Sequence, residues 1–191
     1  TGNIFFGNDS AALVMPAGSN VVLQNSSSGQ ILLSSDYTSA NGFLTLTSGN
    51  GVTFQDLSNN VIATINLGSG ALTVTGAATL ADASINITAT GGISFSSTIN
   101  ADNASSNDRT LTMTSGTGNT IAVAGNIGAS QALSGLTITQ SDGTTFSGTV
   151  DVSDSSSGTI TITDTENGSD VTFAGAVTTD TLDLGQAGYD L

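Results

Sequence analysis

The feature that most constrains the fold of this chain is a short alternation of apolar and polar residues that recurs along most of its length. Residues 111–114 read Leu-Thr-Met-Thr, and residues 160–163 read Ile-Thr-Ile-Thr. Alternation with a period of two is typical of a strand with one buried and one exposed face. Successive copies start 21, 20, 26, 25, 24 and 22 residues apart, at Leu44, Ile65, Ile85, Leu111, Leu136, Ile160 and Leu182.

Two further alternating motifs follow the first one in a fixed order. The second motif ends 9 to 13 positions after the first one opens, at Phe54, Val74, Phe95, Val123, Phe146 and Phe173. The third motif ends at Ile99, Ile127, Val150 and Val177. Gly, Asn, Ser and Asp separate the motifs, so each repeat contains three short strands joined by turns.

A repeat of three strands in 20 to 26 residues predicts one turn of a solenoid. We therefore expect an all-β protein, a right-handed parallel β-helix of about eight coils, roughly 40 Å long at about 4.8 Å per coil. Residues 1–20 are expected to form an irregular partial coil, and residues 21–191 a continuous β-solenoid. Hairpins would lack this three-strand order, and a leucine-rich repeat needs a different leucine pattern.

Stacked coils would place equivalent residues above one another. The opening residues of the first motif, Leu44 to Leu182, should form one inward apolar column, and Phe95 should lie inside between Val74 and Val123. Like charges at this spacing would repel each other, whereas Thr and Asn stack without that cost. The expected outward column is Thr45, Asn66, Asn86, Thr112, Thr137, Thr161 and Asp183.

Charge excludes several classes of partner. The chain has a formal net charge of -14, and Arg109 is its single cationic side chain. Such a surface cannot neutralise phosphates, so we expect no binding to nucleic acid or to anionic lipid. We also expect no membrane insertion, because no apolar run is long enough to span a bilayer. Sparse charge with abundant Ser and Thr favours an extracellular location.

Composition also argues against catalysis. The chain has no His and no Cys, which excludes the usual nucleophile–base pairs and zinc sites. Arg109 lies beside Asp108 at the end of a polar segment, residues 100–109, and is expected to be a solvated loop residue. Close acidic pairs such as Asp151 and Asp154 fit a solvated surface better than a tuned carboxylate pair. We predict no catalytic residues and no enzyme; a carbohydrate-active β-helix is the alternative.

Calcium is the one metal that the sequence leaves open, because Asp and Asn oxygens near turns suit it. The calcium-binding nonapeptide is absent, so we predict no cofactor and regard diffuse cation screening as the main effect. The weak candidate ligands are Asp151, Asp154, Asp164, Glu166, Asp170, Asp180 and Asp183.

Carbohydrate could meet the chain in two ways. Tyr37 or Tyr189 could stack on a sugar, although binding clefts usually offer several aromatic residues. Five N-x-[ST] sequons could carry glycans, and Asn86 and Asn103 are the best placed of Asn8, Asn25, Asn86, Asn103 and Asn167.

Residues 111–121 and 170–177 resemble the repeats of large exported bacterial β-helix proteins, the filamentous-haemagglutinin-like and autotransporter-type adhesins. Similar repeats run from about Val21 onward. The resemblance implies a right-handed parallel β-helix at the cell surface that serves as a stalk, adhesin or matrix fibre. It implies no particular receptor or surface glycan.

The last residues, 182–191, read as part of a repeat that continues. We expect either more solenoid in the same chain or head-to-tail docking of a second copy, which would generate a filament. The predicted function is therefore an extracellular structural or adhesive rod that extends along its axis.

Overall fold

A computed structural model of the chain describes residues 2–7, 12–26, 28–55, 62–81, 84–102, 109–154, 157–166 and 168–185. These residues form strands and turns, and none of them is helical. The strands pair in parallel with strands about one repeat away in the chain, as in the pairing of β11 with β14.

The strands lie on three faces, which the chain visits in turn. Face 1 contains β1 (Ile4–Phe6), β4 (Ile31–Leu33), β7 (Val52–Gln55), β10 (Ala78–Ala81), β13 (Ile99–Ala101), β18 (Val150–Val152) and β21 (Val177–Thr179). Face 2 contains β2 (Leu13–Met15), β5 (Tyr37–Ser39), β8 (Ile62–Asn66), β11 (Ser84–Thr88), β14 (Thr110–Thr114), β16 (Gly135–Gln140), β19 (Thr159–Ile162) and β22 (Thr181–Leu184). Face 3 contains β3 (Val21–Asn25), β6 (Leu44–Ser48), β9 (Leu72–Thr75), β12 (Ile93–Phe95), β15 (Ile121–Val123), β17 (Thr144–Phe146) and β20 (Val171–Phe173).

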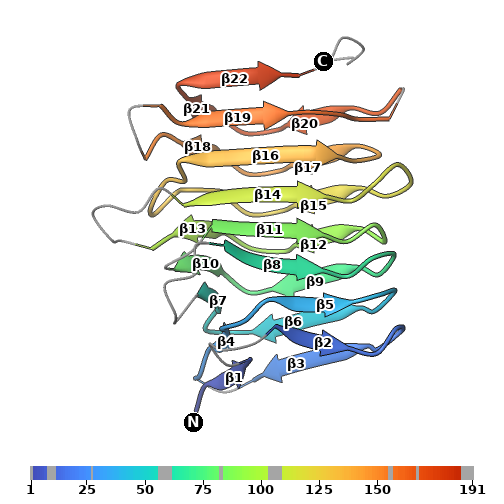
Figure 1. Ribbon diagram of the computed structural model, residues 1–191. Helices are drawn as coiled ribbons and strands as arrows, with labels where there is room; N and C mark the ends of the chain where they lie inside the picture. The colour runs from blue at the N-terminus through green and yellow to red at the C-terminus, as the bar shows by residue number, and fades with distance from the viewer. Residues whose placement is uncertain are drawn as a thin grey trace.

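Each turn of the chain adds one layer to the stack, from β1 at one end to β22 at the other (Figure 1). Six coils contribute a strand to all three faces. On face 1, the bridges of Ile127 to Ile99 and Val150 join the two sheets into one continuous ladder. The prediction of an all-β parallel solenoid is confirmed, whereas the right-handed sense and the number of about eight coils stay predictions.

Apolar ladders fill the interior as the alternation predicts. Phe95 pairs in register with Val74 on one side and Val123 on the other, and its side chain is 2% exposed. On face 2, Leu111 lies between Ile85 and Leu136. Burying one such side chain stabilises the fold by about 1.5–3 kcal/mol, so the ladders supply most of the driving force.

The predicted columns are wrong in the first half of the chain. Leu44 lies on face 3 and pairs with Leu72, not with Ile65. Phe54 lies on face 1 and pairs with Leu80, not with Val74. The same alternation occurs on all three faces, so it identifies a strand but not the face to which the strand belongs. Spacing then has to decide, and it varies between coils.

The outward column on face 2 follows the prediction from Asn86 onward. Asn86, Thr112, Thr137, Thr161 and Asp183 are aligned in successive strands. Before Asn86, two predicted members are wrong. Thr64 rather than Asn66 is the partner of Asn86, and Thr45 lies on face 3.

Coil length varies more than expected. Partners on face 1 are separated by 21 residues from Ile31 to Val52 but by 28 from Ile99 to Ile127, outside the expected range of 20–26. Within residues 1–20, β1 and β2 pair in register with β4 and β5, so the regular stack begins before Val21.

The three corners of the coil differ in length. The corner between face 3 and face 1, here called the glycine corner, needs two to five residues per coil, as at residues 76–77 and 174–176. A Cβ at Gly175 would lie 2.5 Å from the Gly148 carbonyl oxygen, so stacked turns there approach too closely for a side chain. The corner between face 1 and face 2, the loop corner, varies far more; its described parts are residues 7, 12, 34–36, 102, 109, 128–134, 153–154, 157–158 and 180.

Truncation of Phe95 to alanine is expected to lower the free energy of unfolding by about 3–5 kcal/mol, because it leaves a cavity between two packed coils. Chemical denaturation followed by circular dichroism measures the change. Ser94→Ala, one position away on the outward side, is the matched control and should change stability by less than about 0.5 kcal/mol. Equal effects of the two substitutions would contradict the observed register.

Candidate functional site

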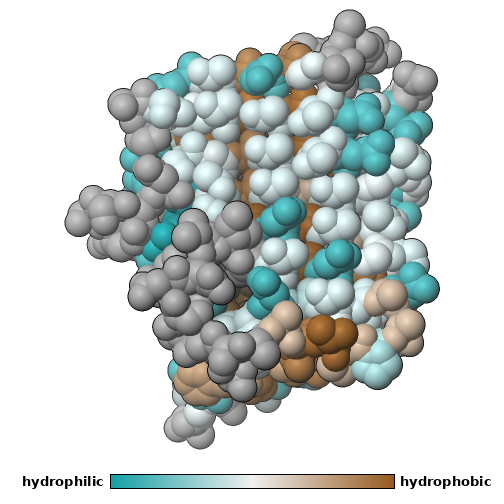
Figure 2. Space-filling model, viewed as in Figure 1, coloured by the Kyte–Doolittle hydropathy of each residue, from teal (hydrophilic) through white to brown (hydrophobic). Residues whose placement is uncertain are grey.

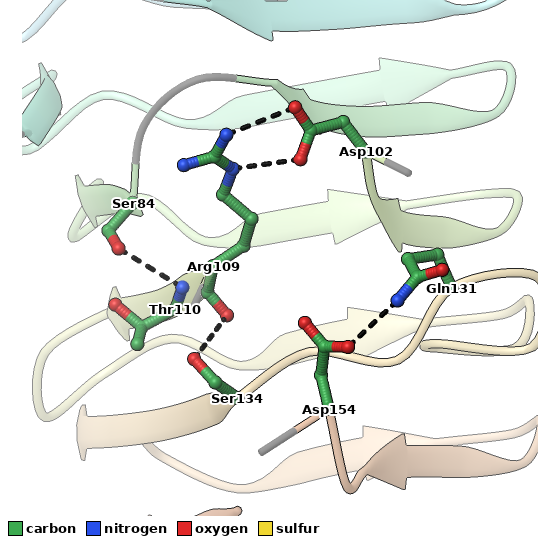
Figure 3. Close-up of polar contacts among 7 residues, drawn as sticks. All are labelled: Ser84, Asp102, Arg109, Thr110, Gln131, Ser134 and Asp154. Atoms are coloured by element: carbon green, nitrogen blue, oxygen red, sulfur yellow. Dashed lines mark hydrogen bonds and ion pairs between the residues drawn. The ribbon is translucent and has the colours of Figure 1, made fainter. Parts of the chain in front are cut away.

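The loop corner gathers the most varied polar side chains of the described chain. Figure 3 shows seven of them, and they come from four successive coils. They are Ser84, Asp102, Arg109, Thr110, Gln131, Ser134 and Asp154. A solenoid confines variation in length to its corners, so this corner is where the chain can present a surface that does not repeat.

Arg109 is held at this corner by a bidentate ion pair. Its Nε and Nη2 atoms donate to the two carboxylate oxygens of Asp102, each at 3.0 Å. The Arg109 side chain is 8% exposed and that of Asp102 is 19% exposed. The expectation of a solvated loop arginine is therefore wrong. A guanidinium makes five directional donors available, and burial beside a strand end requires a planar acceptor such as a carboxylate.

The ion pair belongs to a wider set of contacts between coils. The Arg109 carbonyl oxygen accepts hydrogen bonds from the Ser134 amide at 2.9 Å and from the Ser134 hydroxyl at 3.1 Å. The Thr110 amide donates to the Ser84 hydroxyl at 3.1 Å. Arg109 thus connects β13, through Asp102, to the coil that follows it (Figure 3).

The position of the pair also corrects the predicted loop at residues 100–109. Asn100 and Ala101 are part of β13, so the strand extends into that segment. Asp108, the acid next to Arg109 in sequence, lies outside the described residues. Sequence reasoning missed Asp102 because it took the neighbour in sequence as the partner. The signal available was that Asp102 and Arg109 bracket the segment where two strands end and begin.

The calcium candidates are spread over the last coils rather than gathered. Asp154 accepts a hydrogen bond from the Gln131 amide group at 2.8 Å, and Asp164 accepts one from Gln140 at 3.0 Å. Asp151 accepts one from the Ser153 hydroxyl. Within the described ranges, no three acidic side chains come together as a ligand set.

The remaining acidic candidates occupy separate places. Glu166 is half-buried in the turn between face 2 and face 3, and Asp170 is exposed just before β20. Asp180 lies at the loop corner, where its carboxylate accepts a hydrogen bond from the Gly158 amide at 2.8 Å. Asp183 is exposed on the outward side of β22. Such carboxylates hold neighbouring coils in register through single hydrogen bonds.

Tyr37 is a core residue and not a platform for a sugar. Its side chain is 1% exposed, and its ring lies 5.7 Å from that of Phe6, centroid to centroid. Within the described part of the chain, its hydroxyl is buried and has no hydrogen-bond partner. Burial therefore raises the pKa of Tyr37 above its usual value of 10.0. The other candidate, Tyr189, lies outside the described residues.

The sequons divide in the same way. Asn86 is exposed on face 2. Asn25 is buried, and its side-chain amide donates to the Gly2 carbonyl oxygen at 3.1 Å, so it is unsuited to carry a glycan. Asn8, Asn103 and Asn167 lie outside the described residues.

The chain matches no protein-family model, no curated protein and no solved structure. Among the residues that the structure describes, there is no helix of the length and apolar character that crossing a bilayer requires.

Substituting Arg109 by Gln is expected to lower the free energy of unfolding by about 1.5–3 kcal/mol, the range for hydrogen bonds to charged groups. Asp102→Asn should have a similar effect. The double variant should be less destabilised than the sum by at least about 1 kcal/mol, because each single variant leaves the other charge without its partner. Strictly additive losses in chemical denaturation would show that the pair adds no stability.

Tyr37→Phe is expected to raise the free energy of unfolding by roughly 1 kcal/mol, because it removes a buried hydroxyl that has no partner. The gain should grow as pH rises through about 10. The unfolded state then loses the Tyr37 proton before the folded state does, so the wild-type chain loses stability. The chain has no Lys, Cys or His to obscure this range. Tyr189→Phe is the control, and thermal melts from about pH 8 to 11 measure both.

Proposed function

We propose that this chain is a segment of an extracellular structural or adhesive rod, of the kind that its resemblance to exported bacterial β-helix adhesins implies. Its work is mechanical: it holds a fixed distance along the solenoid axis and presents the loop corner. The rod extends by stacking coils end to end, either within one chain or between copies.

The exposure of Leu182 carries this proposal. Leu182 belongs to the inward column of Leu136 and Ile160, in which both other side chains are 0% exposed. Leu182 itself is 47% exposed, because no described strand lies beyond β22 on this face. One more coil stacked on β22 would bury it as completely as its neighbours are buried.

The opposite end has the complementary surface. The inward residues of the first coil, among them Leu13 and Val21, are half-buried, whereas their column neighbours Tyr37 and Leu44 are buried. At both ends, the outermost strands lack a described neighbour on one edge. Pairing of one end with the other would be head-to-tail, and such a contact does not close but generates a filament.

The composition of the outward columns supports an extracellular setting. Face 2 offers Thr112, Thr137 and Thr161 in line, where many cytosolic surfaces would carry Lys and Glu. Neutral hydroxyl ladders keep a long stack soluble without the repulsion that aligned charges would bring.

Replacing Leu182 by Asp is expected to block axial stacking, because it places a charge in the apolar contact between coils. Light scattering on the wild-type chain should show mass rising with concentration, and electron microscopy should show particles that lengthen but do not widen. L182D should reduce the fraction of longer particles at least fivefold. Thr181→Asp is the matched control, since Thr181 is exposed and faces outward beside Leu182. A wild-type chain that stays monomeric at every concentration would refute axial stacking.

A further inference from the structure

The acidic side chains are not spread evenly around the solenoid. Ten of the fifteen acidic residues of the chain are described. They lie at the loop corner, on faces 1 and 2, or at the corner between faces 2 and 3, and none is on a strand of face 3. These ten are Asp36, Asp102, Asp142, Asp151, Asp154, Asp164, Glu166, Asp170, Asp180 and Asp183.

Face 3 is uncharged over its whole length. Over its first five strands, β3, β6, β9, β12 and β15, the turns on both sides carry no charged residue either. This region is named here the neutral face. Its outward residues are Val22, Gln24, Thr45, Thr47, Thr73, Thr75, Ser94 and Ala122.

We infer that the neutral face is a side-by-side docking surface for a second copy of this chain, with neutral face against neutral face. This contact lies on the side of the rod and is independent of the axial contact proposed above. Because the same patch is used by both partners, the contact closes as a dimer and does not propagate.

Electrostatics selects this side for self-association. With a net charge of -14, two copies repel each other wherever their acidic residues approach. The loop corner lies across the coil from face 3, and two packed sheets are already about 10 Å apart. That separation exceeds the Debye length of about 8 Å at physiological ionic strength, so the acids at the loop corner act weakly across the neutral face. A cationic partner would instead bind on the acidic side.

The shape of the neutral face fits its own copy. Its central outward column, Thr45, Thr73, Ser94 and Ala122, consists of small side chains on a regular ladder. Two such ladders can approach closely and match again after every shift of one coil, about 4.8 Å. Val22 is 64% exposed at one end of the column, and burying it would add an apolar contact.

The size of the surface makes the contact weak. Five strands at about 4.8 Å spacing and three to five residues each give roughly 20 Å by 10–16 Å. The area that two copies would bury is therefore below the range of stable interfaces, roughly 1,200–2,000 Å². A measurement that captures transient pairs is needed.

Thiol cross-linking provides that measurement, because the chain contains no cysteine. Ala122→Cys places a thiol on the neutral face, and Asn86→Cys, equally exposed but on face 2, is the matched control. A bismaleimide with a spacer of about 10 Å spans facing sheets, which a disulfide is too short to bridge. Both variants carry L182D in addition, so that axial stacking, whether or not it occurs, does not contribute.

We expect A122C to give at least fivefold more cross-linked dimer than N86C. Adding Thr45→Asp and Thr73→Asp to A122C should abolish the excess, whereas Thr112→Asp and Thr137→Asp on face 2 should leave it. Thermal melts confirm that each variant folds, and Ser94→Asp alone replaces the Thr45 and Thr73 pair if that pair melts early. Equal yields from A122C and N86C, or an excess that survives the charges on the neutral face, would overturn the inference.

Discussion

The parallel pairing of each coil with the next is the constraint on which the rest of this structure depends. Pairing in register puts equivalent residues about 4.8 Å apart in columns. An inward position must then be apolar in successive coils, as in the buried column of Val74, Phe95 and Val123. An outward position must tolerate its own kind, as Thr112 and Thr137 do. The low charge and high hydroxyl content follow from this geometry rather than from any requirement for a ligand.

The same rule explains where charge is found. A strand is a poor place for an acid, because the next coil repeats the position, so most described acids occupy turns, where coils differ in length. Asp102 and Arg109 show the further consequence. The single cation of the chain is neither a surface charge nor a reactive group, because it is spent on holding two ends of one turn together. The polar contacts of the loop corner are therefore structural as they stand, and any recognition there would use the shape of the turns.

The architecture could be predicted from the sequence because alternation and repeat order are local signals. Phe95 was placed between its correct neighbours, since the coils around it are similar in length. Leu44 and Phe54 were not, because a strand of any face carries the same alternation and the intervening spacing changes. The ion pair of Arg109 depends on where two strands end, and Tyr37 reads as a surface aromatic until its neighbours are known. Contacts between coils thus need the register, which a repeat of variable length leaves open.

One rule therefore produces two kinds of surface. Along the axis, each coil is a template for the next, so an end with half-exposed inward residues such as Leu182 and Val21 is a place for more of the same structure. Around the axis, the corners interrupt the repeat and collect the acids, which leaves a long strip of face 3 without charge. In a rod extended along its axis, a weak lateral contact of the neutral face would recur with each segment, and many weak contacts held by one rod act together. Axial stacking would then determine how strongly the sides associate, although the two surfaces share no residue.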